Sequence, residues 1–191
     1  MRTKFLFISG TPGTGKTRAS RLVARKMRWQ HIDLGKLALK RGTVKGYDRY
    51  RRVPIVDLFG IRAEVMRIAR MTCSKVIILE GSYSHLVPIR RGVLAVIVLR
   101  CDPGILARRL RGRGWGEGKI RENVQSEILG VCMSEALRMH RIVREIDTTG
   151  RSAERICKSV IALYEGGFPR TPTTDWLTKL MFDRRLLRWM V

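Results

Sequence analysis

The residues with the clearest chemical potential form one short run near the start of the chain, from Gly10 to Thr17, with the sequence GTPGTGKT. This run matches the phosphate-loop pattern G-x-x-x-x-G-K-[S/T] at every fixed position. Its glycines allow a tight loop whose backbone amides point inward at phosphate oxygens. Lys16 is expected to reach the β and γ phosphates, and the Thr17 hydroxyl is expected to hold Mg2+. The run therefore predicts a bound nucleoside triphosphate.

The segments on either side of this run have the patterns that a phosphate loop requires. Residues 4–9, KFLFIS, are mostly apolar, as in a buried parallel strand. From Lys16 to Arg28, apolar residues recur at the spacing of a helix. A strand before the pattern and a helix after it distinguish a phosphate loop from an ordinary glycine-rich turn.

A carboxylate ends a second predicted strand. Residues 75–81, KVIILEG, run through four apolar side chains to Glu80. In a protein with a phosphate loop, an acid at the tip of such a strand orders Mg2+, usually through water. The alternative is a surface residue at a strand end, but the loop upstream favours the metal site.

Arginines gather beside a glycine-rich segment in the second half of the chain. Asp102 and Pro103 are typical of a helix N-terminus and predict a helix over 104–111. Alternating glycines in residues 112–116, GRGWG, then end that helix. The neighbouring arginines are Arg108, Arg109, Arg111 and Arg113. They could be a solvated helix end, but a glycine-hinged arginine cluster is also what a closing lid needs to clamp phosphates and exclude water.

Strands and helices alternate along the chain as far as about residue 165. Further strands are predicted at 30–34, 93–99 and 142–147, and further helices at 34–38, 55–70, 117–139 and 152–164. Residues 40–54 are dense in charge and glycine, and they are predicted to form a mobile, solvent-facing insertion. The alternation predicts a doubly wound α/β domain over 1–165 with a five-stranded parallel sheet, whose ligands bind at the carboxyl ends of the strands.

The last part of the chain has a different composition. Residues 166–172, GGFPRTP, are predicted to be a linker. The basic segment 173–191 is predicted to form an amphipathic helix from Asp175 to Met190, capped by Thr173 or Thr174. This helix could dock on the domain or contact a partner or RNA, two alternatives that stay equal, and membrane binding ranks third.

The composition adds constraints on compartment and partner. The 191 residues suit one domain with an appendage, and 39 Lys and Arg against 16 Asp and Glu give a formal net charge of +23. One nucleotide site does not need this charge, which favours a polyanionic partner such as RNA. The four cysteines are far apart and predict buried apolar residues rather than a metal site or disulfides. Without a signal peptide or a transmembrane run, an intracellular, cytoplasmic protein is expected.

Taken together, these segments resemble the nucleoside monophosphate kinases, and within them the nuclear-type adenylate kinase family, which also serves as a small-subunit ribosome maturation factor in archaea and eukaryotes. The likeness covers roughly residues 3–163, and only the phosphate loop is a strong motif alone. The other residues that carry it are GYD at 46–48, PIVD at 54–57, VLR at 98–100, RL at 109–110, RGW at 113–115, EN at 122–123 and EI at 127–128.

The resemblance implies a P-loop NTPase fold and ATP-dependent phosphoryl transfer to a nucleoside monophosphate, chiefly AMP, with a separate ATPase activity. It implies a monophosphate-binding (NMP) segment at 33–55 and a short lid at 112–122. The implied partners are AMP or another nucleoside monophosphate, a ribosomal protein of the small-subunit platform, and the rRNA of a pre-ribosome. By position, the implied residues are Gly13, Thr14, Gly15, Lys16, Thr17, Arg18 and Gly150 for ATP, Lys16, Arg109 and Arg113 for catalysis, Asp33, Gly35, Asp57 and Arg100 for the monophosphate, and Thr17 and Glu80 for Mg2+.

One position departs from the family pattern. Family members commonly have a histidine two residues after the strand-tip acid, which is implicated in ATP hydrolysis, whereas this chain has Ser82. A serine can donate a hydrogen bond but cannot act as a base near neutral pH. The nearest histidine, His85, is equally well explained as a surface residue or as a substitute, whereas His31 and His140 are predicted to be structural. Phosphoryl transfer depends mainly on positioning and charge neutralisation, so this departure puts hydrolysis in question more than transfer.

Three functions remain open from the sequence. The first is a nucleoside monophosphate kinase and ATPase coupled to maturation of the small ribosomal subunit. The second is an assembly switch, in which ATP binding and hydrolysis gate docking and kinase activity is incidental. The third is a kinase for another small molecule or for an RNA 5′ end.

Overall fold

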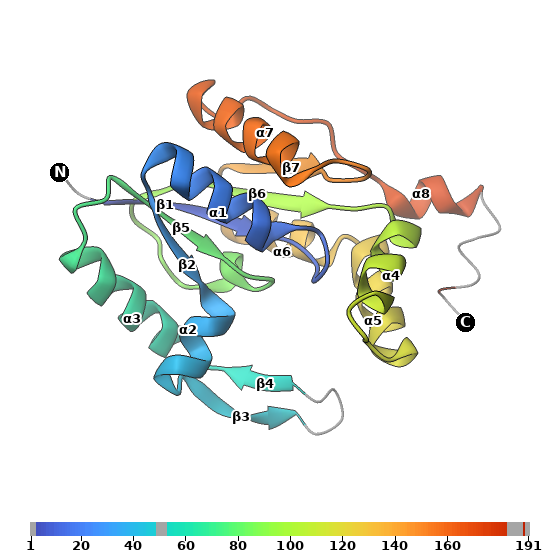
Figure 1. The fold of residues 1–191 in the computed structure, drawn as a ribbon, viewed down its shortest axis with the longest axis horizontal. Coiled ribbons are helices and arrows are strands. Elements are labelled where there is room, and N and C mark those ends of the chain that lie inside the picture. Colours follow the sequence, from blue (N-terminus) through green and yellow to red (C-terminus); the bar gives the residue numbers. More distant parts are fainter. Residues whose placement is uncertain (1–2, 49–52, 183–188, 190–191) are drawn as a thin grey trace.

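A five-stranded parallel sheet forms the centre of the protein (Figure 1). The computed structural model describes residues 3–48, 53–182 and 189. The strands of the sheet lie in the order β2-β5-β1-β6-β7, and all four neighbouring pairs are parallel. Their bounds are β1 Lys4–Ser9, β2 Gln30–Asp33, β5 Val76–Glu80, β6 Val93–Arg100 and β7 Val143–Asp147. The predicted five-stranded parallel α/β fold is confirmed.

Helices cover both faces of the sheet, because side chains of a strand point alternately to either face. Phe5 and Phe7 of β1 pack on the side of α3 (Leu58–Met71) and α6 (Val131–Met139). Leu6 and Ile8 pack on the other side, against α1 (Lys16–Met27) and α7 (Ala153–Glu165). The carboxyl ends of the strands are left free for a site.

A third apolar cluster lies beside the sheet and joins the C-terminal segment to the domain. It is built by α4 (Pro103–Arg111), α5 (Glu117–Ile128) and α8 (Trp176–Met181), with Trp176, Leu180 and Trp189 buried in it. Intramolecular docking, which the sequence left open, is therefore what the described part of this segment shows. Among the described residues, no helix combines the length and apolarity that crossing a membrane requires.

Two predictions about the C-terminal helix need correction. The helix was expected from Asp175 to Met190, but α8 ends at Met181; residues 183–188 and 190–191 lie outside the described part of the chain. Neither predicted threonine caps it, because the Asp175 carboxylate accepts a hydrogen bond from the Thr178 amide at 3.0 Å. A carboxylate is a favourable N-cap because it satisfies an amide that the first helical turn leaves without a partner.

The helix predicted over 117–139 is wrong in extent, since it is two helices, α5 and α6. Gly130 between them adopts a left-handed conformation with φ of 63° and is the N-cap of α6. The apolar spacing continues across this break because both helices bury residues, and periodicity alone could not reveal it. The helix predicted from residue 55 likewise begins later, at Leu58, because the Asp57 carboxylate caps it.

Residues 33–55, for which the resemblance implies monophosphate binding, contain more regular structure than the sequence indicated. This segment begins with α2 (Leu34–Arg41) and continues into an antiparallel hairpin of β3 (Val44–Asp48) and β4 (Val53–Val56). The insertion predicted over 40–54 faces solvent as expected, since residues 40–47 are exposed or half-buried, but its described residues form a hairpin that the sequence did not indicate. Two short strands that pair only with each other bury little, so Tyr47 and Ile55 stay at least half exposed and no clear apolar pattern results. The hairpin projects away from the central sheet (Figure 1).

Candidate active site

The loop after β1 can form only with glycine at certain positions. Gly10 has φ of 134°, and a Cβ there would lie 2.3 Å from the carbonyl oxygen of Leu99 on β6. Gly13 has φ of 97°, and a Cβ there would lie 2.7 Å from a methyl carbon of Leu106 on α4. Any larger residue would push the loop away from these elements. The loop is thus fixed against the end of β6 and against α4, directly before the N-terminus of α1.

Lys16 lies inside this loop and is only 7% exposed. Its ammonium group donates to the carbonyl oxygens of Gly10 at 2.6 Å and Thr11 at 3.0 Å. Burial lowers the pKa of Lys16, and the nearby Glu80 carboxylate opposes that shift. A bound polyphosphate would supply the negative charge that this buried cation lacks, so the geometry favours anion binding here.

The side chains of Thr17 and Glu80 meet beside Lys16. The Thr17 hydroxyl donates to Oε1 of Glu80 at 3.2 Å, while Oε2 of Glu80 is buried with no hydrogen-bond partner among the described residues. Nε2 of His31 lies 3.7 Å from that oxygen. The described residues hold no group of three or more His, Cys, Asp or Glu suited to a metal. One hydroxyl and one carboxylate with an unused oxygen fit Mg2+, which keeps several waters and takes further ligands from phosphates.

Three cavities adjoin the loop. One of about 770 Å³ lies between α1, α4 and the start of α7, and it is called here the arginine cavity. One of about 270 Å³, the central cavity, contains Lys16, Thr17 and Glu80 in its lining. Arg113 lines both, so this arginine stands between them. The arginine cavity is lined by Arg18, Arg21, Arg25, Arg109, Arg113 and Arg151, with Glu154 as the acidic residue in its lining.

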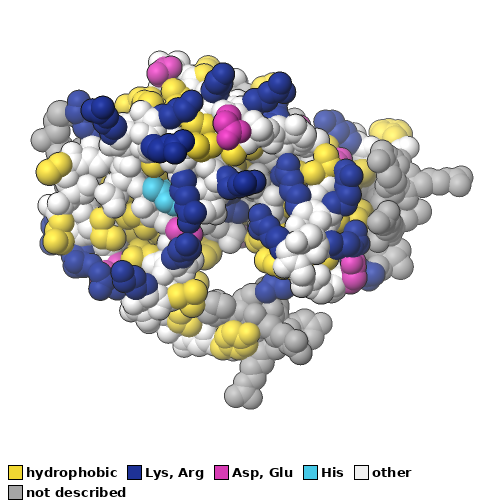
Figure 2. Space-filling model, viewed as in Figure 1, with side chains coloured by type: hydrophobic (Ala, Val, Ile, Leu, Met, Phe, Trp, Pro, Cys, Tyr) yellow, Lys and Arg dark blue, Asp and Glu magenta, His cyan; other side chains and the backbone are white. Residues whose placement is uncertain are grey.

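The third cavity, called the α5 cavity, has a volume of about 730 Å³ and lies between α2 and α5. An opening between the hairpin side and the α4 and α5 side of the molecule is visible in Figure 2. Its cationic lining residues are Lys36 and Lys119, and its acidic ones are Asp33, Glu122 and Glu135. The α5 cavity is therefore much less basic than the arginine cavity.

Tyr83 lines both the central and the α5 cavities. Its hydroxyl is buried and has no hydrogen-bond partner among the described residues. Burial, followed by the charges of Asp33 and Glu80, raises the pKa of Tyr83 to about 12. The phenol therefore stays neutral near pH 7 and can donate a hydrogen bond to a ligand that enters either cavity. Sequence reasoning missed this residue, which no local motif marks.

Most of the predicted site residues gather around these cavities. Gly13, Gly15, Arg18, Arg109 and Arg113 line the arginine cavity, and Lys16, Thr17, Asp33, Gly35 and Glu80 line the central one. Thr14 is buried within the loop, where its hydroxyl donates to the carbonyl oxygen of Thr11 at 2.9 Å. Gly150, with φ of 62°, directly precedes Arg151 of the arginine cavity.

Arg100 and Asp57 are not in the lining of the three cavities. Arg100 is 3% exposed, and its Nε donates to Oε1 of Glu127 at 2.7 Å. Asp57 accepts from the Phe59 amide at 3.1 Å and caps α3, and Lys45 lies 3.4 Å away. The Gly60 amide in particular lowers the pKa of Asp57. This geometry gives both residues intramolecular partners and does not support the monophosphate contact expected of them.

His85 does not replace the histidine that Ser82 displaces. His85 is fully buried, with Nδ1 2.6 Å from the Ser9 hydroxyl and Nε2 2.9 Å from a Glu135 carboxylate oxygen. Burial lowers the pKa of His85, although Glu135 acts in the opposite direction. A surface position is therefore wrong, and both ring nitrogens are occupied away from the central cavity. Ser82 itself lines the central cavity.

Comparison with known proteins agrees with this geometry. Residues 6–130 match a family model described as an AAA domain. A protein of Pyrococcus furiosus named "Putative adenylate kinase" is 36% identical over 172 residues, which cover 88% of this chain and 89% of the relative. Its namesake from Methanothermobacter thermautotrophicus is 39% identical over 160 residues, which cover 83% and 88%.

Solved structures of two kinases have a similar fold. The shikimate kinase of Acinetobacter baumannii, in complex with shikimate, superposes with a TM-score of 0.60 at 14% identity over 86% of this chain and 94% of that one. A sugar kinase from Janibacter gives a TM-score of 0.58 at 16% identity over 85% and 95%. At these identities the likeness shows the fold alone, that of the P-loop kinases. Together with the archaeal relatives, it shows that the chain belongs to the archaeal adenylate kinase family of P-loop NTPases.

Proposed function

We propose that the protein is a nucleoside monophosphate kinase that transfers the γ-phosphoryl group of ATP to AMP and forms two ADP. The observation that carries the proposal is the position of the phosphate loop between two large cavities. The central cavity lies at the same loop and is lined by Lys16, Thr17, Glu80 and Arg113. A donor nucleotide on one side and an acceptor on the other would meet at these four residues. The names of the archaeal relatives support adenosine nucleotides as the substrates.

The donor belongs in the arginine cavity. The triphosphate would lie on residues 10–17, with Lys16 and the N-terminus of α1 at its β and γ phosphates. Arg109 is already held in place, since its guanidinium donates to the carbonyl oxygens of Gly13 and Thr148 at 3.3 Å. The adenine would extend toward the Gly150 turn at the start of α7. Arg113, which is exposed on the lid, would close over the phosphates.

The acceptor belongs in the α5 cavity. Lys36 and Lys119 supply positive charge for one phosphate group, and Tyr83 offers a hydrogen-bond donor. The ring of Trp115 lies 5.0 Å from the Lys119 ammonium group and gives the cavity an apolar surface for a base. Asp33 and Gly35 line the edge toward the central cavity. These features suit a monophosphate better than a second triphosphate.

The proposed reaction needs little from the protein beyond positioning and charge neutralisation. An oxygen of the AMP phosphate attacks the γ phosphorus, and the bond to the β–γ bridging oxygen breaks in line with it. The donor leaves as ADP, and the acceptor, which now carries the transferred phosphoryl group, leaves as the second ADP. Lys16 and Arg113 stabilise the charge on the equatorial and bridging oxygens. Mg2+, held by Thr17 and through water by Glu80, would neutralise charge on the β and γ phosphates.

The test is to measure ADP formation from ATP with and without AMP. The proposal predicts that AMP increases the rate strongly, because Ser82 lines the central cavity and cannot act as a base that activates water. An assembly ATPase would show little dependence on AMP. A screen of other acceptors covers the remaining alternative, and the absence of any stimulation by AMP would contradict the proposal.

We further propose that the kinase acts in the cytoplasm in small-subunit maturation, where it contacts rRNA and a platform protein. The support for an RNA partner is electrostatic: the net charge is +23, and among the charged side chains on the face shown in Figure 2 Lys and Arg predominate over Asp and Glu. Arg21 and Arg25 extend the basic lining along α1. RNA binding should weaken steeply with salt. Affinity for RNA no greater than that of a neutral protein at 150 mM salt would contradict this part.

A further inference from the structure

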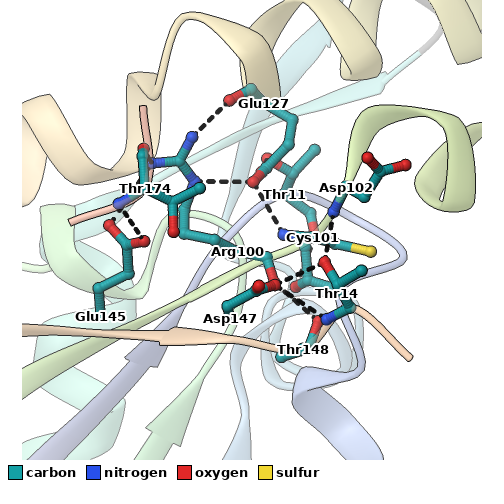
Figure 3. Close-up of polar contacts among 12 residues, drawn as sticks. Thr11, Thr14, Arg100, Cys101, Asp102, Glu127, Glu145, Asp147, Thr148 and Thr174 are labelled. Carbon is teal, nitrogen blue, oxygen red and sulfur yellow. Dashed lines mark hydrogen bonds and ion pairs between the residues drawn. The ribbon is translucent and has the colours of Figure 1, made fainter. Parts of the chain in front are cut away.

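A buried carboxylate joins the phosphate loop to α5 (Figure 3). Oε2 of Glu127 accepts from the Thr11 hydroxyl at 2.5 Å. Oε1 accepts from Nε of Arg100 at 2.7 Å and from the Cys101 amide at 3.0 Å. Thr11, Arg100 and Glu127 are all 3% exposed or less. The carboxylate is therefore fully engaged, with one donor from the loop and two from the end of β6.

Thr11 is the residue through which such a contact can control the loop. Its carbonyl oxygen accepts from the Thr14 hydroxyl at 2.9 Å, from the Thr14 amide at 3.2 Å and from Lys16 at 3.0 Å. The side chain of Thr11 thus faces α5, whereas its backbone organises the interior of the loop. A shift of Thr11 would be passed to the catalytic lysine.

Arg100 holds Glu127 from the opposite side. Besides the Nε contact, its Nη2 donates to the backbone carbonyl of Glu127 at 2.7 Å. A Cβ at Gly130 would lie 3.4 Å from its Nη1, so the junction of α5 and α6 packs directly on the guanidinium. Nη1 also reaches the carbonyl oxygen of Thr174 at 3.4 Å, and the Thr174 amide donates to Glu145 at 2.7 Å. The C-terminal segment therefore braces the same arginine.

The same part of α5 also lines the cavity assigned to the acceptor. Asn123 and Ser126 of this helix line the α5 cavity, and Ser126 directly precedes Glu127. We propose that Glu127 is a positioning residue that fixes the phosphate loop through Thr11 and so ties the loop to the wall of the acceptor cavity. Arg100, which also contacts the carbonyl oxygen of Thr174, holds the Glu127 carboxylate in place beside Thr11. This inference rests on the proposed kinase function, because that function assigns the α5 cavity to the acceptor. Its test measures binding of an ATP analogue and does not require kinase activity.

Burial makes the arrangement sensitive to small changes. A hydrogen bond to a charged group is stronger than one between neutral groups, and a buried charge that loses a partner is strongly destabilised. Replacing Thr11 by valine keeps the shape of the side chain but removes the donor. Replacing Glu127 by glutamine keeps the shape but replaces one accepting oxygen by an NH2 group, which cannot accept from the donor that faces it.

The test measures ATP affinity by calorimetric titration with a non-hydrolysable ATP analogue, and kcat and KM where turnover is detectable. Thr11→Val should weaken analogue binding about tenfold and lower kcat, while Thr11→Ser, which retains the hydroxyl, should restore both. The matched control is Thr3→Val. It also removes a threonine hydroxyl that donates a hydrogen bond, to the Ser74 carbonyl at 3.3 Å, but at the far end of β1, and it should leave analogue affinity unchanged.

Glu127→Gln should act in the same direction as Thr11→Val and more strongly, with thermal unfolding recorded to show that the protein remains folded at the assay temperature. Analogue binding by folded Thr11→Val that equals the wild type, or a loss that Thr11→Ser does not restore, would overturn the proposal. Titration with the analogue needs no acceptor. If the wild-type protein binds the analogue but AMP does not stimulate ADP formation, the proposed kinase function is refuted. The role of Glu127 in positioning the loop can still be tested by the analogue titration.

Discussion

The two large cavities beside the phosphate loop are close in volume but opposite in character. The arginine cavity, about 770 Å³, has six arginines and one glutamate in its lining. The α5 cavity, about 730 Å³, has two lysines against three acidic residues. Electrostatic affinity for phosphate must therefore differ strongly across a single loop. The contrast indicates one side built for a polyphosphate and another that selects its ligand more by shape and hydrogen bonding.

This asymmetry assigns direction to the proposed reaction. A donor that carries three phosphates is held mainly by charge, and a lid residue such as Arg113 can follow it into the central cavity. An acceptor with one phosphate needs fewer cations, and excess charge would let a second triphosphate occupy its place. The α5 cavity, with two lysines against three acidic residues, thus disfavours a second triphosphate in the place of the acceptor.

The largest effect is expected where the two sides meet. Lys16→Ala should lower kcat for phosphoryl transfer and for ATP hydrolysis by at least about a hundredfold, because it removes a buried cation at the transferred group. Steady-state kinetics with thermal unfolding check this. Lys26→Ala, an exposed lysine on the same helix, is the matched control and should behave as the wild type. Normal turnover by Lys16→Ala would contradict the assignment of the active site to the phosphate loop.

The arginines of the arginine cavity are expected to differ in role according to whether they also line the central cavity. Arg113→Ala should lower kcat by about tenfold to a hundredfold, since Arg113 also lines the central cavity. Arg21→Ala should leave kcat unchanged and weaken RNA binding at low salt, because Arg21 lines the arginine cavity without reaching the central one. Equal kcat values for the two variants would contradict the proposal that Arg113 acts in catalysis and Arg21 does not.

On the acceptor side, removal of one of its two cations should act on a single substrate. Lys119→Ala should raise KM for AMP by about threefold to tenfold and leave KM for ATP unchanged, because Lys119 lines the α5 cavity but not the arginine cavity. Initial rates with each substrate varied in turn give both constants. An increase confined to KM for ATP would reverse the assignment of donor and acceptor.

The smallest effect is expected outside both cavities. Asp57→Asn should lower the melting temperature slightly and leave KM for AMP unchanged, since Asp57 caps α3. The Gly60 amide lowers the folded pKa of Asp57 below its ordinary value of 3.8. The stabilisation is therefore present above pH 3.8 and is lost as the pH falls through the folded pKa. Melting curves of the two proteins should converge in acid. A raised KM for AMP would restore the substrate role that the resemblance implied.

The sequence predicted the parts of the site that depend on neighbouring residues. The phosphate loop is one uninterrupted run, and its flanking strand and helix follow from local patterns over residues 4–28. Glu80 was predictable because the apolar run of β5 ends on it. The strands β1, β5 and β6 are likewise marked by short apolar runs that are largely buried. β2 and β7 carry weaker patterns, with one and three buried residues, and were predicted from the alternation of strands and helices.

The contacts that join distant segments were not predictable in this way. Thr11 and Glu127 are 116 residues apart, and neither the loop pattern nor the periodicity of α5 indicates that they meet. Arg100 ends a strand beside the site, as expected, but the carboxylate that covers it comes from another helix. The break at Gly130 was missed because apolar spacing continues through it. Such features depend on tertiary packing, which periodicity does not encode.

The most direct test of the two-sided site is a crystal structure with a bisubstrate dinucleotide, two adenosines joined by a chain of phosphates. One adenosine should occupy the arginine cavity near the Gly150 turn, and the other the α5 cavity near Tyr83 and Trp115, with the phosphates on Lys16 and Arg113. A dinucleotide bound with its second adenosine outside the α5 cavity would contradict the assignment of that cavity to the acceptor and with it the proposed kinase reaction.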